Sequence, residues 1–326
     1  MPLPRFKYLE ARSTQEVCDA LKEHGAKARV MGGGTDLLVS MKQRVIAPSL
    51  VVGLRRLSGM DTIFFDPTEG LKIGVLSTLF DIENSSLVRR DYPMLAEAAG
   101  QVASPHIRRM GTIGGNLCLD SRCLYYNQSH FWKKSLPICF KQGGELCHVV
   151  KGGHRCFAVY SGDLAPALIA MGARIRLVNG EQERVIPLEE LFSGEGQRPI
   201  AIGTHEIATD VIVPPSHQGS GKFLKYRLRG SIDFPLVNAA VFVKKLNGRY
   251  EDVRIVVGGV DSAPLRIKEA EEVLRGGRFE EGLLDKAAEA VREKVHPVNN
   301  TGGSPAHRRI MAHILVKEAL HQAWKN

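Results

Sequence analysis

Cysteine is the residue type whose spacing in this chain most clearly suggests chemistry. Six cysteines occur, and five of them fall within the short stretch 118–156. Four of these, Cys123, Cys139, Cys147 and Cys156, can supply a complete four-thiolate site. Disulfides are rare in reducing compartments, and thiolates are ligands for zinc and for iron–sulfur clusters. The stretch therefore predicts a metal site.

The spacing of the four cysteines leaves the kind of metal open. Fifteen, seven and eight residues separate successive cysteines, so the segment lacks both the C-x2-C pair of a zinc ribbon and the close cysteine run of bacterial ferredoxins. We favour a cluster over zinc, with unliganded thiols third, because glycines can turn backbone amides toward sulfides and aromatic rings can exclude water. The glycines are Gly143, Gly144, Gly152 and Gly153, and the aromatic residues are Tyr125, Tyr126, Phe131, Trp132 and Phe140. The other two thiols, Cys18 and Cys118, are predicted to be packed.

Two glycine-rich stretches have the composition of phosphate-binding loops. Gly32-Gly33-Gly34-Thr35-Asp36 directly follows a short apolar segment, and Gly111-Thr112-Ile113-Gly114-Gly115-Asn116 is predicted to be a second glycine-rich turn. Glycine lets backbone amides approach a phosphate closely, and threonine adds a hydroxyl donor. Neither stretch is a Rossmann or P-loop fingerprint, and each alone is more often a plain turn. As a pair they favour a dinucleotide such as FAD, with its pyrophosphate held from both sides.

Three α+β units must position these loops and cysteines. The first, residues 1–55, is predicted to have strands at 6–9, 28–31 and 50–53 and a helix from the capping box Ser13-x-x-Glu16 to about His24. The second, residues 56–215, is predicted to have strands at 70–75, 173–178 and 211–214, helices at 85–100 and 164–171, and a cysteine-rich insertion at about 118–158. The third, residues 216–326, is predicted to have a loop at 216–222, a hairpin across Asn247-Gly248 with strands 237–246 and 250–260, and helices at about 266–274, 283–295 and 305–324.

The bulk composition is that of a globular cytoplasmic protein. The chain has 326 residues, of which 44% are hydrophobic and 24% charged, with no apolar run long enough to cross a bilayer and no apolar signal segment at its start. The net charge is +9, but the basic residues are scattered and acidic residues lie between them. We therefore expect a basic surface that faces solvent or an acidic partner, and neither nucleic acid nor membrane as a binding partner.

Four segments, in order and over nearly the whole chain, resemble the flavoprotein subunits of xanthine dehydrogenase and carbon monoxide dehydrogenase. They are 30–37, 102–116, 161–173 (with Gly162 inserted relative to the family) and 223–240. The resemblance implies an α+β fold, a two-part FAD-binding domain of the PCMH type followed by a smaller C-terminal α+β domain. It also implies that residues 29–36 and 111–115 hold the FAD pyrophosphate, and that Asp163 and Lys225 contact the ribityl chain or the flavin ring. From the residues alone Lys225 would be taken for a surface lysine. The implied FAD-binding set is Arg29, Val30, Met31, Gly32, Gly33, Gly34, Thr35, Asp36, Gly111, Thr112, Ile113, Gly114, Gly115, Asn116, Asp163 and Lys225.

The cysteine insertion departs from those subunits and resembles the β subunits of 4-hydroxybenzoyl-CoA reductases. The resemblance lies in 122–129 and in the residues around Cys139 and Cys147. It implies a [4Fe-4S] cluster on Cys123, Cys139, Cys147 and Cys156. It further implies that reduced ferredoxin delivers electrons through the cluster and FAD to a [2Fe-2S] small subunit and a molybdopterin-containing large subunit, in a dimer of heterotrimers.

No Rossmann or molybdopterin signature is present, so the chain is predicted to be an electron-transfer subunit with no catalytic residue of its own. Lysines 133, 134 and 141 are predicted to form a cationic surface that steers an acidic ferredoxin. Two alternatives stay open: a freestanding FAD oxidoreductase with a structural four-cysteine zinc site, and a partner- or nucleic-acid-binding module with a zinc-stabilised loop.

Overall fold

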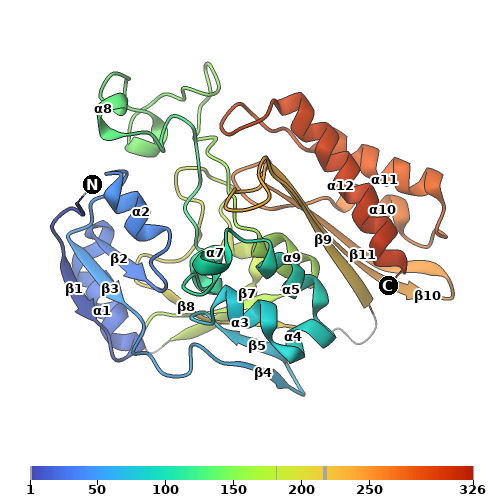
Figure 1. Cartoon of the computed structure of the whole chain (residues 1–326), viewed down its shortest axis with the longest axis horizontal. Helices are drawn as coiled ribbons and strands as arrows, with labels where there is room; N and C mark the ends of the chain where they lie inside the picture. The colour runs from blue at the N-terminus through green and yellow to red at the C-terminus, as the bar shows by residue number, and fades with distance from the viewer. Residues whose placement is uncertain (1, 181, 216–218, 326) are drawn as a thin grey trace.

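Three β-sheets, one from each successive part of the chain, organise the computed structural model (Figure 1). The structure describes residues 2–180, 182–215 and 219–325. The strands are β1 Lys7–Glu10, β2 Ala28–Met31, β3 Leu50–Gly53, β4 Ile63–Asp66, β5 Gly70–Gly74, β6 Arg174–Val178, β7 Glu183–Pro187, β8 Ile207–Val213, β9 Gly219–Tyr226, β10 Val237–Leu246, β11 Arg249–Gly258 and β12 Leu265–Arg266. The helices are α1 Thr14–His24, α2 Leu37–Lys42, α3 Leu79–Asn84, α4 Ser86–Asp91, α5 Pro93–Gly100, α6 Pro105–Arg108, α7 Ile113–Leu117, α8 His130–Lys133, α9 Leu164–Ala170, α10 Lys268–Leu274, α11 Glu281–Lys294 and α12 Pro305–Lys325, with 3-10 turns at Gly25–Lys27, Phe140–Gln142 and Leu188–Leu191. The predicted α+β fold is confirmed.

The first sheet is parallel, with strand order β1-β3-β2. The strands predicted at 28–31 and 50–53 are confirmed, and α1 begins as expected because the Ser13 hydroxyl accepts a hydrogen bond from the Glu16 amide at 3.2 Å. Parallel strands present their carboxyl ends at one edge of the sheet, which is where such sheets bind ligands. The first glycine loop leaves β2 at that edge.

The second sheet is antiparallel, in the order β4-β5-β8-β6-β7. The single helix predicted at 85–100 is wrong: it is two helices, α4 and α5, that meet at Tyr92. Pro93 opens α5, and the residue before a proline is driven out of the α region; Tyr92 has φ −135° and ψ 50°. The predicted turn 111–116 also proves partly helical, because Thr112 caps the short helix α7.

The third sheet is antiparallel, in the order β12-β11-β10-β9. The predicted hairpin is confirmed: Asn247 and Gly248 both have positive φ, as a type I′ turn requires. The loop predicted at 216–222 is wrong from Gly219 onward, where β9 begins, and its first three residues lie outside the described chain. A Cβ at Gly221 would lie 2.8 Å from the Met94 sulfur, so the glycines that suggested a loop make room for packing within a strand.

Helices cover both faces of the third sheet. Helices α10, α11 and α12 pack over one face and enclose a separate hydrophobic core, while α5 and α9 pack against the other face (Figure 1). A larger core joins the first and second sheets and extends to the α9 side of the third. The three parts are therefore held against one another around α9, which is buried along its whole length.

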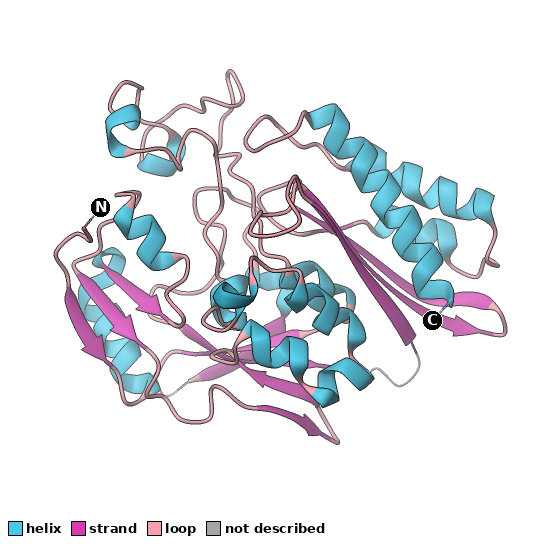
Figure 2. Ribbon diagram, viewed as in Figure 1, coloured by secondary structure: helices cyan, strands magenta, loops and turns pink. Residues whose placement is uncertain are grey.

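The cysteine-rich insertion extends away from the sheets as a largely irregular segment that carries α8 and a 3-10 turn (Figure 2). Between α7 and α9 it passes from the second glycine loop out to α8 and back. Within the described residues, no helix combines the length and the apolar character that crossing a bilayer demands.

Candidate functional site

A cleft of about 680 Å³ opens where the three parts of the chain meet. Its volume lies in the range of cofactor pockets. Both glycine loops line it, together with Asp163 before α9 and the segment Ile232 to Phe234 after β9. All predicted FAD-binding residues line the cleft except Ile113, Gly114 and Lys225.

The first glycine loop presents backbone donors to the cleft. Among the described residues, none accepts a hydrogen bond from the amides of residues 32 to 36. The loop also presses against the second one: a Cβ added to Gly33 would lie 1.7 Å from the Met110 carbonyl oxygen. Free amides on a tight turn form an anion-binding concavity, which fits a pyrophosphate.

The second glycine loop is built differently. The amide of Gly114 donates to Val75 O at 2.9 Å, and that of Gly115 to the Thr112 hydroxyl at 3.1 Å. These amides are therefore used within the protein. Gly114 packs so closely on the residue that follows β5 that an added Cβ would lie 2.8 Å from the Val75 Cβ, which explains why Gly114 does not reach the cleft. The second loop thus shapes the wall through Gly111, Thr112, Gly115 and Asn116.

Arg122 places a cation in the cleft at the start of the cysteine insertion. It pairs with Asp36 of the first loop, and its guanidinium lies 4.7 Å from the Phe234 ring centroid. Burial lowers its pKa. Its Nε–H is buried and has no partner within the described chain, which marks it as a donor for an anionic ligand. The FAD-binding set above omitted Arg122, although it lies directly beside a predicted metal ligand.

Asp163 and Lys225 form a buried ion pair at the inner wall of the cleft. Lys225 Nζ lies 2.6 Å from Asp163 Oδ2 and 3.1 Å from Gln101 O, and the Asn238 amide donates to Asp163 Oδ1 at 3.0 Å. Burial raises the pKa of Asp163 and lowers the pKa of Lys225. The Lys225 side chain is 0% exposed, so it reaches the cleft only through Asp163.

Breaking this pair is expected to destabilise the fold. Lys225→Met leaves Asp163 buried without its cation and should reduce the free energy of unfolding by about 3–5 kcal/mol, measured by urea denaturation. The double variant Asp163→Asn, Lys225→Met should recover part of that loss, because it removes the charge as well. Lys244→Met on the neighbouring strand, where the ion pair with Glu251 is partly exposed, should cost no more than about 1 kcal/mol. Equal losses for the two lysine variants would contradict this account.

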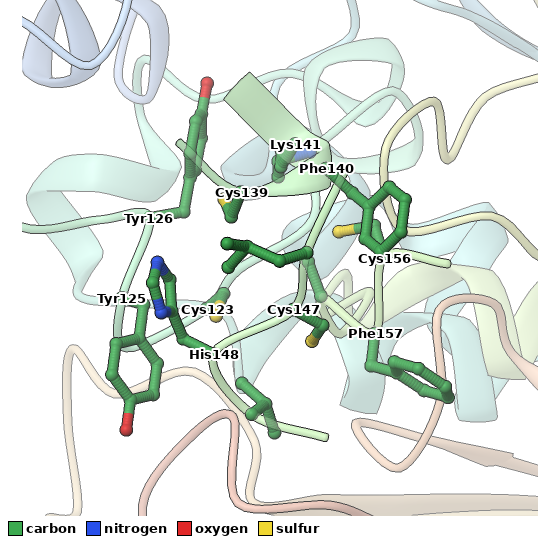
Figure 3. Close-up of a pocket in the computed structure, with 13 residues that line it drawn as sticks. Cys123, Tyr125, Tyr126, Cys139, Phe140, Lys141, Cys147, His148, Cys156 and Phe157 are labelled. Carbon is green, nitrogen blue, oxygen red and sulfur yellow. The ribbon is translucent and has the colours of Figure 1, made fainter. Parts of the chain in front are cut away.

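The four predicted metal ligands surround a second cavity within the insertion. Cys123, Cys139, Cys147 and Cys156 all line it, and its volume is about 20 Å³ (Figure 3). Burial raises the pKa of Cys156 to about 11, so a metal would have to displace the proton of this thiol. Among the residues that the structure describes, no three His, Cys, Asp or Glu side chains are grouped so as to hold a single metal ion.

Backbone turns and rings complete the wall of the cysteine cavity. Gly143 has φ +91°, and the Gly144 amide folds back onto Cys139 O at 2.9 Å. The Val150 amide donates to the Cys147 sulfur at 3.5 Å. The aromatic residues on the wall are Tyr125, Tyr126, Phe140 and Phe157. The prediction that Phe131 and Trp132 shield the cavity is wrong, because they lie outside its wall and Phe131 is 89% exposed on α8.

Hydrogen bonds from the C-terminal domain also hold the cysteine segment. Asn300 O accepts a hydrogen bond from the Leu124 amide at 2.8 Å, and the Asn300 side chain donates to Phe157 O. Asn300 thereby joins the residues next to Cys123 and Cys156. It is held in turn by Arg308, which is fully buried and whose hydrogen bonds within the described residues all go to oxygens of carbonyl type.

The predicted cationic surface needs correction at one lysine. Lys134 is exposed and Lys133 is half-buried, but the Lys141 side chain is 3% exposed and faces inward. Its ammonium group hydrogen-bonds to Asp120, Ser121 and Gly196 O. Lys141 therefore cannot contribute to an outer docking surface.

Comparisons with known proteins cover the whole architecture. Residues 4–216 match the family described as the FAD binding domain in molybdopterin dehydrogenase, and residues 222–323 match the CO dehydrogenase flavoprotein C-terminal domain. The chain is 27% identical to the nicotine 6-hydroxylase medium subunit of Paenarthrobacter nicotinovorans, over 99% of both chains. It is 31% identical to the aldehyde oxidoreductase FAD-binding subunit PaoB of Escherichia coli, over 77% of this chain and 80% of that one.

Among solved structures, the chain superimposes on carbon monoxide dehydrogenase from Hydrogenophaga pseudoflava with a TM-score of 0.82 and 25% identity, over 100% of this chain and 99% of that one. The match to the FAD-binding family spans the first two parts of the chain, which carry both glycine loops of the cleft, and the free amides of the first glycine loop suit the anionic part of FAD. The chain therefore belongs to the FAD-binding medium subunits of the xanthine dehydrogenase and carbon monoxide dehydrogenase family of molybdenum hydroxylases, oxidoreductase subunits that work with large and small partner chains.

Proposed function

We propose that this medium subunit carries a [4Fe-4S] cluster beside its FAD and serves a ferredoxin-dependent molybdenum enzyme that reductively dehydroxylates 4-hydroxybenzoyl-CoA. The observation that carries the proposal is the cavity lined by four cysteines next to the flavin cleft. A cluster suits four thiols around a shared space because each thiolate binds a different iron. The cysteine insertion also resembles the segment that carries a cluster in 4-hydroxybenzoyl-CoA reductases.

Within the cleft, we assign the FAD pyrophosphate to the free amides of residues 32 to 36 and to the Arg122 side chain. Asp163, held by Lys225 and Asn238, would contact the ribityl chain or the flavin ring. Lys225 then acts as a positioning residue rather than as a direct contact. FAD supplies the exchange between one-electron and two-electron chemistry that links a ferredoxin to the molybdenum subunit.

The overall reaction would consume two electrons and two protons, remove the phenolic hydroxyl and release water. Ferredoxin supplies the electrons, and the substrate lies on the large subunit. We place the complex in the cytoplasm, where thiols stay reduced, as a dimer of heterotrimers.

The insertion carries the charge expected for an acidic donor. Between positions 118 and 158 there are six Lys or Arg against two Asp or Glu, a net charge of 6 − 2 = +4. Lys141 and Arg122 face inward, so Lys133, Lys134, Lys151 and Arg155 are the cations at the outer surface. Lys134→Glu should slow flavin reduction by reduced ferredoxin about tenfold at low salt and flatten its dependence on ionic strength. Stopped-flow bleaching of the flavin measures this rate. The matched change Lys286→Glu, on the exposed side of α11, should leave the rate unchanged; an equal effect of both changes would show that only net charge matters.

Metal and flavin analysis after anaerobic purification of the complex tests the assignment. Iron at about four atoms per medium subunit beyond the small-subunit clusters, with FAD, supports it. Zinc in place of iron would make the four-cysteine site structural and leave the alternative of a flavoprotein without a second electron entry point. Turnover of 4-hydroxybenzoyl-CoA with reduced ferredoxin, compared with other hydroxylated aromatic CoA thioesters, then tests the substrate.

A further inference from the structure

Two residues belong to both cavities of the molecule. Tyr126 and Lys141 line the cysteine cavity and also the flavin cleft. Tyr126 is 8% exposed, and the Lys141 side chain is 3% exposed. Together these two side chains form a wall that the two spaces share, and Figure 3 shows them beside the cysteine cavity.

Lys141 fastens this shared wall to the flavin-binding domain. Its Nζ lies 2.8 Å from each of three acceptors, Asp120 Oδ1, Ser121 Oγ and Gly196 O. An ammonium group has three protons, so the three contacts use its full donor capacity. Asp120 and Ser121 follow the second glycine loop, while Gly196 comes from the connection between the 3-10 turn Leu188–Leu191 and β8. Because Lys141 belongs to the turn next to Cys139, these bonds pin a cysteine-bearing turn to the wall of the cleft.

Two lysines contact the Tyr126 ring. The ammonium groups of Lys141 and Lys133 each lie 5.2 Å from its ring centroid, within the range of a cation–π contact. The two lysines differ in their hydrogen bonds to the flavin-binding domain. Lys133 lies on α8 outside both cavities, and among the described residues no hydrogen bond ties its ammonium group to the flavin-binding domain.

We propose that Lys141 is a positioning residue that sets the separation between the metal centre and the flavin, with Tyr126 as the wall that electrons cross between them. The inference rests on the proposed function. Each crossing moves one electron from the reduced cluster to the flavin; the electron comes from a one-electron carrier of the ferredoxin class, and two crossings with proton uptake from solvent complete flavin reduction. Cutting the three hydrogen bonds would let the cysteine turn move away from the cleft.

The test compares Lys141→Met, Lys141→Arg and Lys133→Met in the complete complex. Iron and FAD contents are measured first. The distance between the metal centre and the flavin is then followed by electron paramagnetic resonance. A reduced cluster near the flavin speeds the relaxation of the flavin radical signal, so slower relaxation reports a larger distance. The transfer rate is followed by flavin bleaching with reduced methyl viologen, after subtraction of the rate in a Cys156→Ala variant, where only direct reduction remains.

Lys141→Met should keep FAD, weaken the relaxation enhancement and slow the cluster-dependent rate severalfold, because electron transfer slows steeply with distance and the freed turn can move away from the cleft. Lys141→Arg keeps the charge but replaces a compact three-proton donor by a planar fork, so it should also slow transfer. With methyl viologen, a cation that does not use the lysine surface predicted for ferredoxin, Lys133→Met should stay within about twofold of the wild type, since it removes the same kind of charge from the same ring without unpinning the turn.

The outcomes distinguish a failure of the proposed function from a failure of the positioning role of Lys141 alone. Wild-type complex with no iron on this subunit overturns the proposed function and this inference with it. Iron and FAD at wild-type levels, with unchanged relaxation and rate in both Lys141 variants, overturn the inference alone. If Lys141→Met does not assemble, the Lys141→Arg variant decides, because arginine retains the cation: an unchanged relaxation enhancement overturns the inference.

Discussion

Cys156→Ala is expected to remove the iron of this subunit while FAD stays bound. Cys156 is the most buried of the four cysteines around the cavity, and its neighbour Phe157 is held by Asn300 of the C-terminal domain. When this side chain is shortened, a cluster with four thiolate ligands loses the thiolate of one iron. It also loses the buried side of its binding site. The iron assigned to this subunit should fall from about four atoms to near zero, and the flavin should no longer be reduced by ferredoxin.

Cys18→Ala is the matched control for that experiment. Cys18 is also buried, but it lies on α1 in the core of the first part of the chain, where its sulfur faces Val178 O at 3.6 Å. The same atoms are removed, and the metal content should not change. Full iron retention in Cys156→Ala, or equal iron loss in both variants, would mean that the cavity does not hold the metal. Because the two glycine loops line the flavin cleft and not the cysteine cavity, FAD content reports whether the rest of the subunit is folded.

Gly33→Ala is expected to abolish FAD binding. The added Cβ would lie 1.7 Å from the Met110 carbonyl oxygen, which is backbone and cannot turn aside. The two glycine loops must therefore separate, and the free amides of the first loop lose their place opposite the second. We expect a loss of at least about 3 kcal/mol in FAD binding, or more than about 100-fold in affinity, measured by titrating FAD onto the apoprotein with flavin fluorescence.

Gly282→Ala controls for the general effect of adding a methyl group to glycine. Gly282 lies on α11, and nothing lies within 4 Å of its added Cβ. Alanine favours a helix over glycine by about 1 kcal/mol, so this variant should bind FAD normally and have a slightly higher free energy of unfolding. Wild-type affinity in Gly33→Ala would show that the close approach of the loops is not needed for the cofactor.

Predictions from sequence succeeded where local chemistry decides local structure. The capping serine before α1, the Asn247-Gly248 turn and the apolar strands β2 and β3 depend on neighbours in the chain, and all three are confirmed. Errors arose where a distant contact overrides the local pattern. The glycines at the start of β9 suggest a loop, but they lie in a strand because Met94 and Phe242 fill the space beside them.

The sequence by itself determined the chemical inventory of this protein: two glycine loops, four cysteines on an insertion, and four segments in the order of a known flavoprotein family. Only the tertiary structure decided how that inventory is used. It leaves the amides of the first glycine loop free and uses those of the second, and it places Arg122 in the cleft and turns Lys141 inward. The physical reason is sequence separation. The partners of Lys141 and Asn300 lie up to 55 and 176 residues away, and hydrogen bonds over such distances depend on how the domains pack rather than on any pattern in the neighbouring residues.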